Sequence, residues 1–559
     1  MLKKIILLLL FIVSVTANSR AQVQSIKERE AKSAYIEAIE AFVNDEFDQA
    51  TILLLEAYNE SSPNAGISFA LADVYFMQDD LPNAAFYGKE AVQLTPENKW
   101  YRFKLAEIYR AAGQNQATLD ELITLLTFHP DDYDALFMLA DTQNDYGQYL
   151  QSNQTLNKIL RLTGPNPVVL IRKFENFKAL NAPDSALIQL ESLRDVEPDN
   201  LNTLNLLAGY YERVGRIGES KKVLQDALYR NARDPESLIN LSSLYIDEAK
   251  WDSAGTLLGN FVSDPIISAE QKYMIAQFMY VRHQQDLKNI QLQIETARIL
   301  DLYTNNESNY GLAFTLAGQF FSTIDETLKA VEMLEIANNL VPEDDIAWRL
   351  RLQLLLSEKR YDDAIEVGIE ANVHVPEDAF IQYFVGTAFM LNSDSKKAIT
   401  WLENAARAPS RRPFKSIIYG ILGDAQSDLD NNKEADRVYE LALRYDPKNH
   451  NAMNNYAYNL SIREENLDRA KELALRAIEL DAENAAYLDT VGWVYFKLGD
   501  FDRARRFIKA SIDTGLASAE VFEHLGDVYE ALGNLVDAKK WWKQALDLDG
   551  TRTHLIDKI

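Results

Sequence analysis

Apolar residues recur along this chain at the three- and four-residue intervals of amphipathic helices. The segment 485–512 is a clear example, because Gly499 and Asp500 separate two such patterns and glycine is favoured where a helix ends. The apolar and small residues of the two patterns are Leu488, Val491, Gly492 and Tyr495, then Phe501, Ala504, Phe507 and Ile508. The pattern therefore predicts a helix, a short turn and a second helix that packs back on the first.

This helix pair is repeated along most of the chain in constant phase. Small residues recur every 34 residues in one set: Ala50, Ala84, Thr118, Ser152, Ala186, Ser220 and Ala254. A second set recurs with steps of 34 to 37 residues: Ala330, Ala364, Ala398, Ala435, Ala470, Ala504 and Ala538. A regular period of this length predicts a solenoid, in which each unit buries its apolar face on its neighbours.

The segments AYLDTVGWVYFKLGDFDRA and HLGDVYEALGNLVDAKKWWKQALDLD resemble the tetratricopeptide repeat (TPR). The resemblance covers about residues 31–550, although Phe174 and Leu352 stand where most units have a small residue. It implies an all-α fold, an α-solenoid that forms a right-handed superhelix of stacked TPR helix pairs. It also implies a protein that holds other proteins, with the first helix of each unit lining the inner surface.

The two phased sets do not join directly, because Ala254 and Ala330 are more than two periods apart. We therefore expect an N-terminal array at 22–266 and a C-terminal array at 310–550, followed by a tail at 551–559. The intervening segment 267–309 predicts two helices, at about 268–284 and 287–303. It is either one degenerate, enlarged repeat or a hinge between two solenoids.

The N-terminus has the layout of a secretory signal peptide. Lys3 and Lys4 precede an apolar run from Ile5 to Val13, and small and polar residues follow as far as Ala21. This predicts a signal at 1–21 and export to the periplasm or the exterior. The alternative is an uncleaved anchor. No cysteine is present for a lipoprotein signal, and no later segment is apolar enough to span a membrane.

Charge and composition favour a non-catalytic protein. The formal net charge of −27 argues against nucleic acid as a partner and is compatible with a basic protein or peptide. The six histidines are dispersed and the chain contains no cysteine, so no metal site is expected. No nucleotide, nucleophile-elbow or zinc-protease motif occurs, and the repeats occupy the whole chain. We therefore expect no enzyme activity and no cofactor.

One candidate binding surface lies on the predicted first helices of four successive units. One position in each unit is apolar and the position four residues later, on the same helix face, is acidic. These candidate groove residues are Phe69 and Asp73, Phe103 and Glu107, Phe137 and Asp141, and Ile171 and Glu175. We call them the N-terminal stripe. They suit a basic or amphipathic peptide, although apolar positions at this spacing also serve as ordinary packing. At the acidic position, later units return to acid only at Asp424 and Asp527.

The sequence offers two other candidate surfaces. The step of 37 residues between Ala398 and Ala435 introduces a basic segment, whose candidate contact residues are Arg407, Arg411, Arg412 and Lys415. This segment is either a site for an acidic partner or phosphate, or a solvated connector. Some tetratricopeptide-repeat proteins hold the C-terminal carboxylate of a peptide with Lys, Arg and Asn side chains on adjacent first helices. Asn451 and Asn455 supply amides here, but the next unit offers Asp489 and Thr490 instead of cations.

The sequence therefore favours an exported protein–protein interaction scaffold that supports assembly or stability of an envelope complex. The alternative is a peptide-binding adaptor or chaperone-like module that uses the N-terminal stripe.

Overall fold

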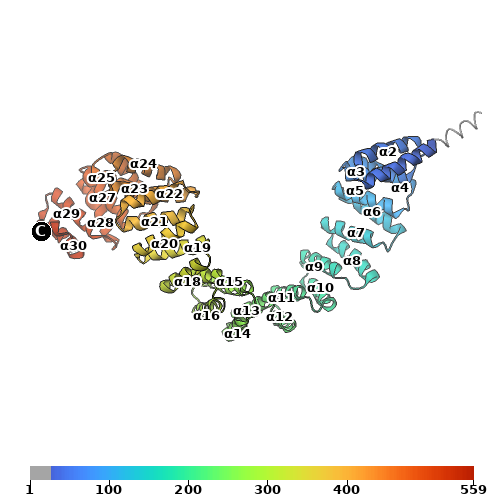
Figure 1. Ribbon diagram of the computed structural model, residues 1–559, viewed down its shortest axis with the longest axis horizontal. Coiled ribbons are helices and arrows are strands. Elements are labelled where there is room, and N and C mark those ends of the chain that lie inside the picture. Colours follow the sequence, from blue (N-terminus) through green and yellow to red (C-terminus); the bar gives the residue numbers. More distant parts are fainter. Residues whose placement is uncertain (1–26) are drawn as a thin grey trace, which may run out of the picture. The chain divides into compact units, whose positions relative to one another are not determined.

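The computed structural model describes residues 27–559, and the predicted signal segment 1–21 lies outside them. Helices account for nearly all the regular structure of the described residues, and no strand occurs among them. The prediction of an all-α solenoid is confirmed. The chain divides into two compact units, one ending at Lys250 and the other beginning at Trp251 (Figure 1).

The first unit is a stack of antiparallel helix pairs, each helix packing on the next along the chain. Residues 27–43 form its first described helix. The others are α2 (Phe47–Glu60), α3 (Ala65–Met77), α4 (Leu81–Leu94), α5 (Lys99–Ala111), α6 (Asn115–Phe128), α7 (Tyr133–Asp145), α8 (Tyr149–Thr163), α9 (Pro167–Ala179), α10 (Pro183–Val196), α11 (Leu201–Arg213), α12 (Ile217–Arg230) and α13 (Pro235–Asp247).

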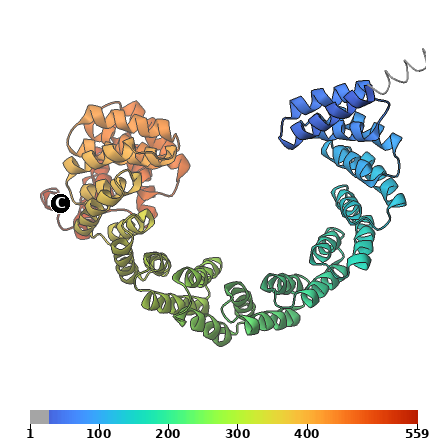
Figure 2. The same cartoon turned by 45° about the vertical axis from the view of Figure 1, so that its right-hand side comes forward.

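The second unit repeats the same arrangement (green to red in Figure 2). Its helices are α14 (Trp251–Ser263), α15 (Ala269–Gln285), α16 (Ile290–Asn306), α17 (Gly311–Thr323), α18 (Thr327–Leu340), α19 (Asp345–Ser357), α20 (Tyr361–His374), α21 (Ala379–Leu391), α22 (Ser395–Arg407), α23 (Arg412–Asp428), α24 (Asn432–Tyr445), α25 (His450–Arg463), α26 (Leu467–Leu480), α27 (Ala485–Lys497), α28 (Phe501–Asp513), α29 (Ala519–Ala531) and α30 (Leu535–Leu548), with the 3₁₀ turn η1 (Thr553–Leu555).

A residue with a short polar side chain caps the start of the first helix in most repeats. The side chain of Asn64 accepts hydrogen bonds from the backbone N–H groups of Gly66 and Ile67, and Asp132 accepts one from Ala135. These caps satisfy backbone donors that have no partner inside the helix. At the other end of α5, Gly113 has a φ of 68°, a left-handed conformation that ends the helix and turns the chain into α6.

Small residues allow the two helices of a pair to approach closely. Ala50 and Ala84 are completely buried. Two glycines of first helices leave room for a ring of the second helix. A Cβ on Gly526 would lie only 2.3 Å from a ring atom of Trp542, and a Cβ on Gly423 only 2.6 Å from a ring atom of Tyr439. The periodic small residues are therefore packing positions between helices.

The irregular segments become helices of greater length. Helices α15 and α16 each have 17 residues and belong to the second unit, where α16 packs on α14 and α17. The extra residues near 407–415 lengthen α23 to 17 residues instead of forming a long loop. The boundary between the two compact units falls after Lys250. The predicted end of the N-terminal array at 266 stays a prediction, as does the choice between a repeat and a hinge for 267–309.

The tail folds back on the last helix pair. Leu555 is completely buried in a cluster with Ala538, Trp542 and Ala545. Arg552 pairs with Glu523, and the Lys558 ammonium lies 3.0 Å from Asp527. These contacts cover apolar residues of α30.

Candidate functional site

The apolar members of the N-terminal stripe are only partly available. Phe69, Phe103 and Phe137 are half-buried on α3, α5 and α7, while Ile171 on α9 is 42% exposed. The ring of Phe69 lies 4.8 Å from that of Tyr101, and Phe103 packs against the core formed by α5, α6 and α7. The aromatic rings therefore contribute to packing between units and leave one edge to the surface.

The acidic members of the stripe are paired with cations of the same chain. The Lys104 ammonium lies 3.0 Å from Asp73 and 2.9 Å from Glu107, so it bridges α3 and α5. Its pKa is raised: burial alone would lower it, but hydrogen bonds to the two carboxylates outweigh that effect.

The same arrangement continues along α7 and α9. Arg172 lies 3.5 Å from Asp141, and Lys178 lies 2.5 Å from Glu175 on its own helix. Each of the four carboxylates thus has an intramolecular cation, and a basic partner would have to compete with it.

A groove opens where the stripe ends. Its volume is about 560 Å³, and it is lined by residues of α9, α11 and α13, among them Glu175, Asn205, Gly209 and Arg213. Gly209 stands at the acidic position of the stripe, and a Cβ there would meet no atom within 4 Å. The glycine leaves this position without a side chain, and Glu175 is the stripe residue that lines the groove.

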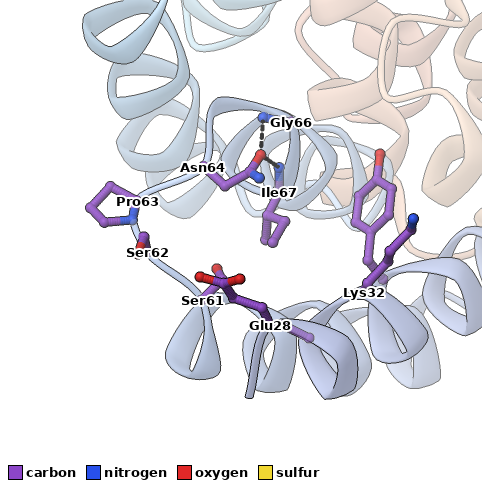
Figure 3. Close-up of a pocket in the computed structure, with 10 residues that line it drawn as sticks. Glu28, Lys32, Ser61, Ser62, Pro63, Asn64, Gly66 and Ile67 are labelled. Atoms are coloured by element: carbon purple, nitrogen blue, oxygen red, sulfur yellow. Dashed lines mark hydrogen bonds between the residues drawn. The ribbon is translucent and has the colours of Figure 1, made fainter. Parts of the chain in front are cut away.

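A further cavity of about 460 Å³ lies beside the first described helix (Figure 3). Glu28 and Lys32 approach it from that helix, and Ser61 to Asn64 approach it from the turn before α3. The Asn64 side-chain oxygen is occupied in capping α3. No buried polar group is aimed into this cavity without a partner.

The basic segment is partly engaged with its own chain. Arg407 ends α22 and donates to the carbonyl of Glu403, and Arg412 in the first turn of α23 donates to the carbonyl of Arg444. Arg411 immediately precedes α23 and is exposed, and Lys415 is half-exposed in its first turn. The four residues therefore do not converge on one point, and their role as a contact surface stays a prediction.

In the second unit, Asp424 occupies the same repeat position as the stripe acids but has different surroundings. It lies on α23 and lines a cavity of about 280 Å³, together with Tyr383 of α21 and Asn451 and Asn455 of α25. Its carboxylate accepts hydrogen bonds from the Tyr439 hydroxyl and from the Asn455 amide, 3.1 Å away. Burial raises the pKa of Asp424 to about 6, because the charged form is poorly solvated and these neutral donors offset only part of that cost.

A second polar cluster lies on α25, α27 and α29. His524 is buried, stacks on Trp493 at 3.8 Å and has its Nδ1 2.9 Å from Asp489. Burial lowers the pKa of His524, but the charge and hydrogen bond of Asp489 outweigh this, so the net pKa is raised. The Tyr458 hydroxyl donates to Glu520 across this cluster. Asp489 and Glu520 thus have partners inside the cluster, whereas the buried indole nitrogen of Trp493 has no hydrogen-bond partner among the described residues.

No group of histidine and acidic residues within 27–559 is arranged to hold a metal ion. Across the same residues, no helix has both the length and the apolar character needed to cross a membrane.

The family models that match this chain agree with this architecture. Residues 417–449 and 491–552 match family models described as tetratricopeptide repeat. A TPR repeat-containing protein of Pseudomonas aeruginosa is 24% identical over 148 residues, which are 26% of this chain and 24% of the relative. The match thus spans about a quarter of the relative's length.

Solved structures with similar helix arrays include the Cut9-Hcn1 hetero-tetramer of the APC/C. That match has 14% identity and a TM-score of 0.38, and covers 90% of this chain and 96% of the other. A tetratricopeptide repeat protein from Parabacteroides merdae matches at 15% identity and a TM-score of 0.37, covering 44% of this chain and 96% of its own.

The matched family models fall on α23, α24 and the helices from α27 to α30, and the same helix pair recurs in phase through both units. The chain is a tetratricopeptide-repeat protein.

Proposed function

We propose that this protein is an exported, non-catalytic scaffold that holds partner proteins and supports assembly or stability of an envelope complex. Tetratricopeptide repeats support protein–protein interaction, and no enzyme family is indicated by the matches. The observation that favours a scaffold over a peptide adaptor is the pairing of the stripe acids with Lys104, Arg172 and Lys178. A surface that satisfies its own charges offers less to a basic peptide than a surface of free carboxylates.

The adaptor is kept as the second candidate because one end of the stripe is open. Ile171 is 42% exposed, and Glu175 lines the groove at Gly209. A peptide held there would lie over α9 and α11.

The first experiment compares proteins that co-purify with the full-length tagged chain from the native envelope fraction after mild cross-linking. One variant replaces Asp73, Glu107, Asp141 and Glu175 with alanine. A matched control replaces four exposed acids of second helices with alanine: Glu56, Asp120, Asp184 and Asp195.

If the protein is a scaffold, both variants retain the reproducible partners of the wild type. Loss of one partner from the folded stripe variant alone would instead establish the adaptor. Recovery of no specific partner with the wild type contradicts both candidates.

Export is tested separately by cell fractionation and by sequencing the N-terminus of the mature chain. Cleavage after Ala21 leaves Gln22 as the first residue. Changing Leu8 to Arg interrupts the apolar run, and we expect the variant to stay in the cytoplasm. A wild-type chain found in the cytoplasm with Met1 intact excludes export, and an intact chain in the membrane fraction indicates the uncleaved anchor.

A further inference from the structure

The cavity on α21, α23 and α25 of the second unit is built around missing side-chain volume. Gly420 of α23 is buried at its edge, and a Cβ there would meet only ordinary contacts, 3.5 Å from Ala452 and 3.9 Å from the Asn449 amide. Ile421 and Tyr383 supply apolar walls, and Asn451 and Asn455 supply amides. The result is a recess of about 280 Å³ with a carboxylate in its wall.

The carboxylate of Asp424 has no cationic partner among residues 27–559. Its hydrogen-bond donors are a hydroxyl and an amide, from Tyr439 and Asn455. An ionised carboxylate can accept about four hydrogen bonds, so acceptor capacity remains on Oδ2. Asn451 also accepts from the Tyr487 hydroxyl through an oxygen that has a second lone pair.

This electrostatic situation favours a cation from outside the chain. A buried carboxylate loses solvation, and a positive charge within about 4–6 Å restores the stability of its ionised form. Acids at the same repeat position elsewhere already have such a charge: Lys104 beside Asp73, and Lys558 beside Asp527. Asp424 is the exception, and it faces a recess.

We propose that this recess receives a lysine or arginine side chain of a partner protein, with its cation on Asp424 and its alkyl stem against Tyr383 and Ile421. Long basic side chains bury an apolar stem in this way while the charged head binds elsewhere. The net charge of −27 attracts basic segments to the chain at long range. The inference rests on the proposed function, since it names a chemical contact through which a scaffold holds its partner.

The test uses capped pentapeptides of glycine and serine with arginine, lysine or citrulline at the centre. Citrulline has nearly the shape of arginine but no charge. Binding to the full-length protein at pH 7.5 is followed by saturation-transfer NMR on the side-chain protons of the central residue, a method suited to millimolar affinities. We expect a signal for arginine or lysine at least about fivefold above that for citrulline, and the ratio of the two basic peptides identifies the preferred cation.

Two variants locate the site. Asp424→Asn removes the charge, and Gly420→Leu fills the recess while leaving Asp424 and its hydrogen bonds in place. Both reduce the signal to the level of citrulline if the proposal is right. Asp527→Asn removes a charge from the same repeat position, where Lys558 already pairs with it, and serves as the matched control, with no expected change. Lowering the pH from 7.5 to 5 weakens binding in the wild type, because a protonated Asp424 no longer attracts a cation.

Equal signals for arginine, lysine and citrulline in the wild type overturn the proposal, and this comparison needs no variant to fold. Retained binding in a folded Gly420→Leu variant, or loss with Asp527→Asn, also overturns it. These outcomes are independent of partner capture from the envelope fraction. The two experiments can therefore fail separately. The protein can have envelope partners although the recess binds no basic side chain, and the recess can bind a basic side chain although no envelope partner is found.

Discussion

The first and second units place acids at the same position of the repeat, but only the first unit neutralises all of them. Asp73 on α3 meets the Lys104 ammonium at 3.0 Å, whereas Asp424 on α23 meets a tyrosine hydroxyl and an amide. The period determines which helix face a carboxylate occupies. Its chemistry depends on whether the neighbouring helix brings a cation within reach.

The largest expected effect is on how stability depends on pH. The pKa of Asp424 is raised to about 6 in the folded chain, above the value near 3.9 expected when it is unfolded. Its contribution to stability is therefore fully present below pH 4 and is lost as the pH rises to 6, by at most about 3 kcal/mol. Asp424→Asn should remove this loss, measured as the difference in free energy of unfolding between pH 4 and pH 7.

Asp132 in the first unit should show the opposite sign. Burial raises its pKa, but hydrogen bonds from Lys99 and from the backbone of Ala135 outweigh that and lower it overall. Its contribution is present above the unfolded pKa and is lost as the pH falls. If Asp132→Asn and Asp424→Asn changed the pH profile in the same direction, the contrast between paired and unpaired acids would be wrong.

The next effect compares two helical glycines. At Gly423 a Cβ would lie 2.6 Å from the Tyr439 ring, whereas at Gly209 no atom lies within 4 Å. Gly423→Ala should displace Tyr439 from Asp424 and destabilise the second unit by about 1–3 kcal/mol. Gly209→Ala should stabilise the first unit by about 0.5–1 kcal/mol, because alanine is the better helix former. Urea unfolding followed by circular dichroism measures both, and similar shifts for the two variants would contradict the packing described.

The smallest effect concerns the stripe itself. Lys104→Met removes the cation between Asp73 and Glu107, but both carboxylates are partly solvated, so the expected cost is below about 1 kcal/mol. The variant should instead bind the arginine pentapeptide in the first unit, since it frees two acids. Saturation-transfer NMR with Lys104→Met and with Lys104→Met/Asp73→Asn tests this. No gain in binding would mean that stripe acids cannot hold a cation even when unpaired.

Much of the fold was predictable from local pattern. The 34-residue spacing of small residues correctly identified the helix pairs, and Ala50 and Ala84 are completely buried as that spacing requires. The sequence carries a further signal: Asn64, Asn98 and Asp132 recur at the same period and cap the first helices of their repeats. That spacing could have located the helix starts to within a residue.

The candidate site was less predictable, because binding surfaces depend on side chains that come from different helices. The acidic positions of the stripe were placed on one face, but the reach of Lys104 from α5 to Asp73 on α3 required the packed structure. The sequence predicts the basic segment from Arg407 to Lys415 as either a contact surface or a solvated connector, and it does not indicate that Arg412 and Lys415 lie in the first turn of α23.

The sequence by itself determined the repeat, the helix pairs and the positions of small residues, because these follow from periodic spacing along one chain. Only the tertiary structure decided which carboxylates are neutralised and where recesses form. A cavity arises where a position without a side chain, such as Gly420, lies against a neighbouring helix that does not fill it. The surroundings of Asp424 combine α21, α23, α24 and α25, and their distances are set by packing between units.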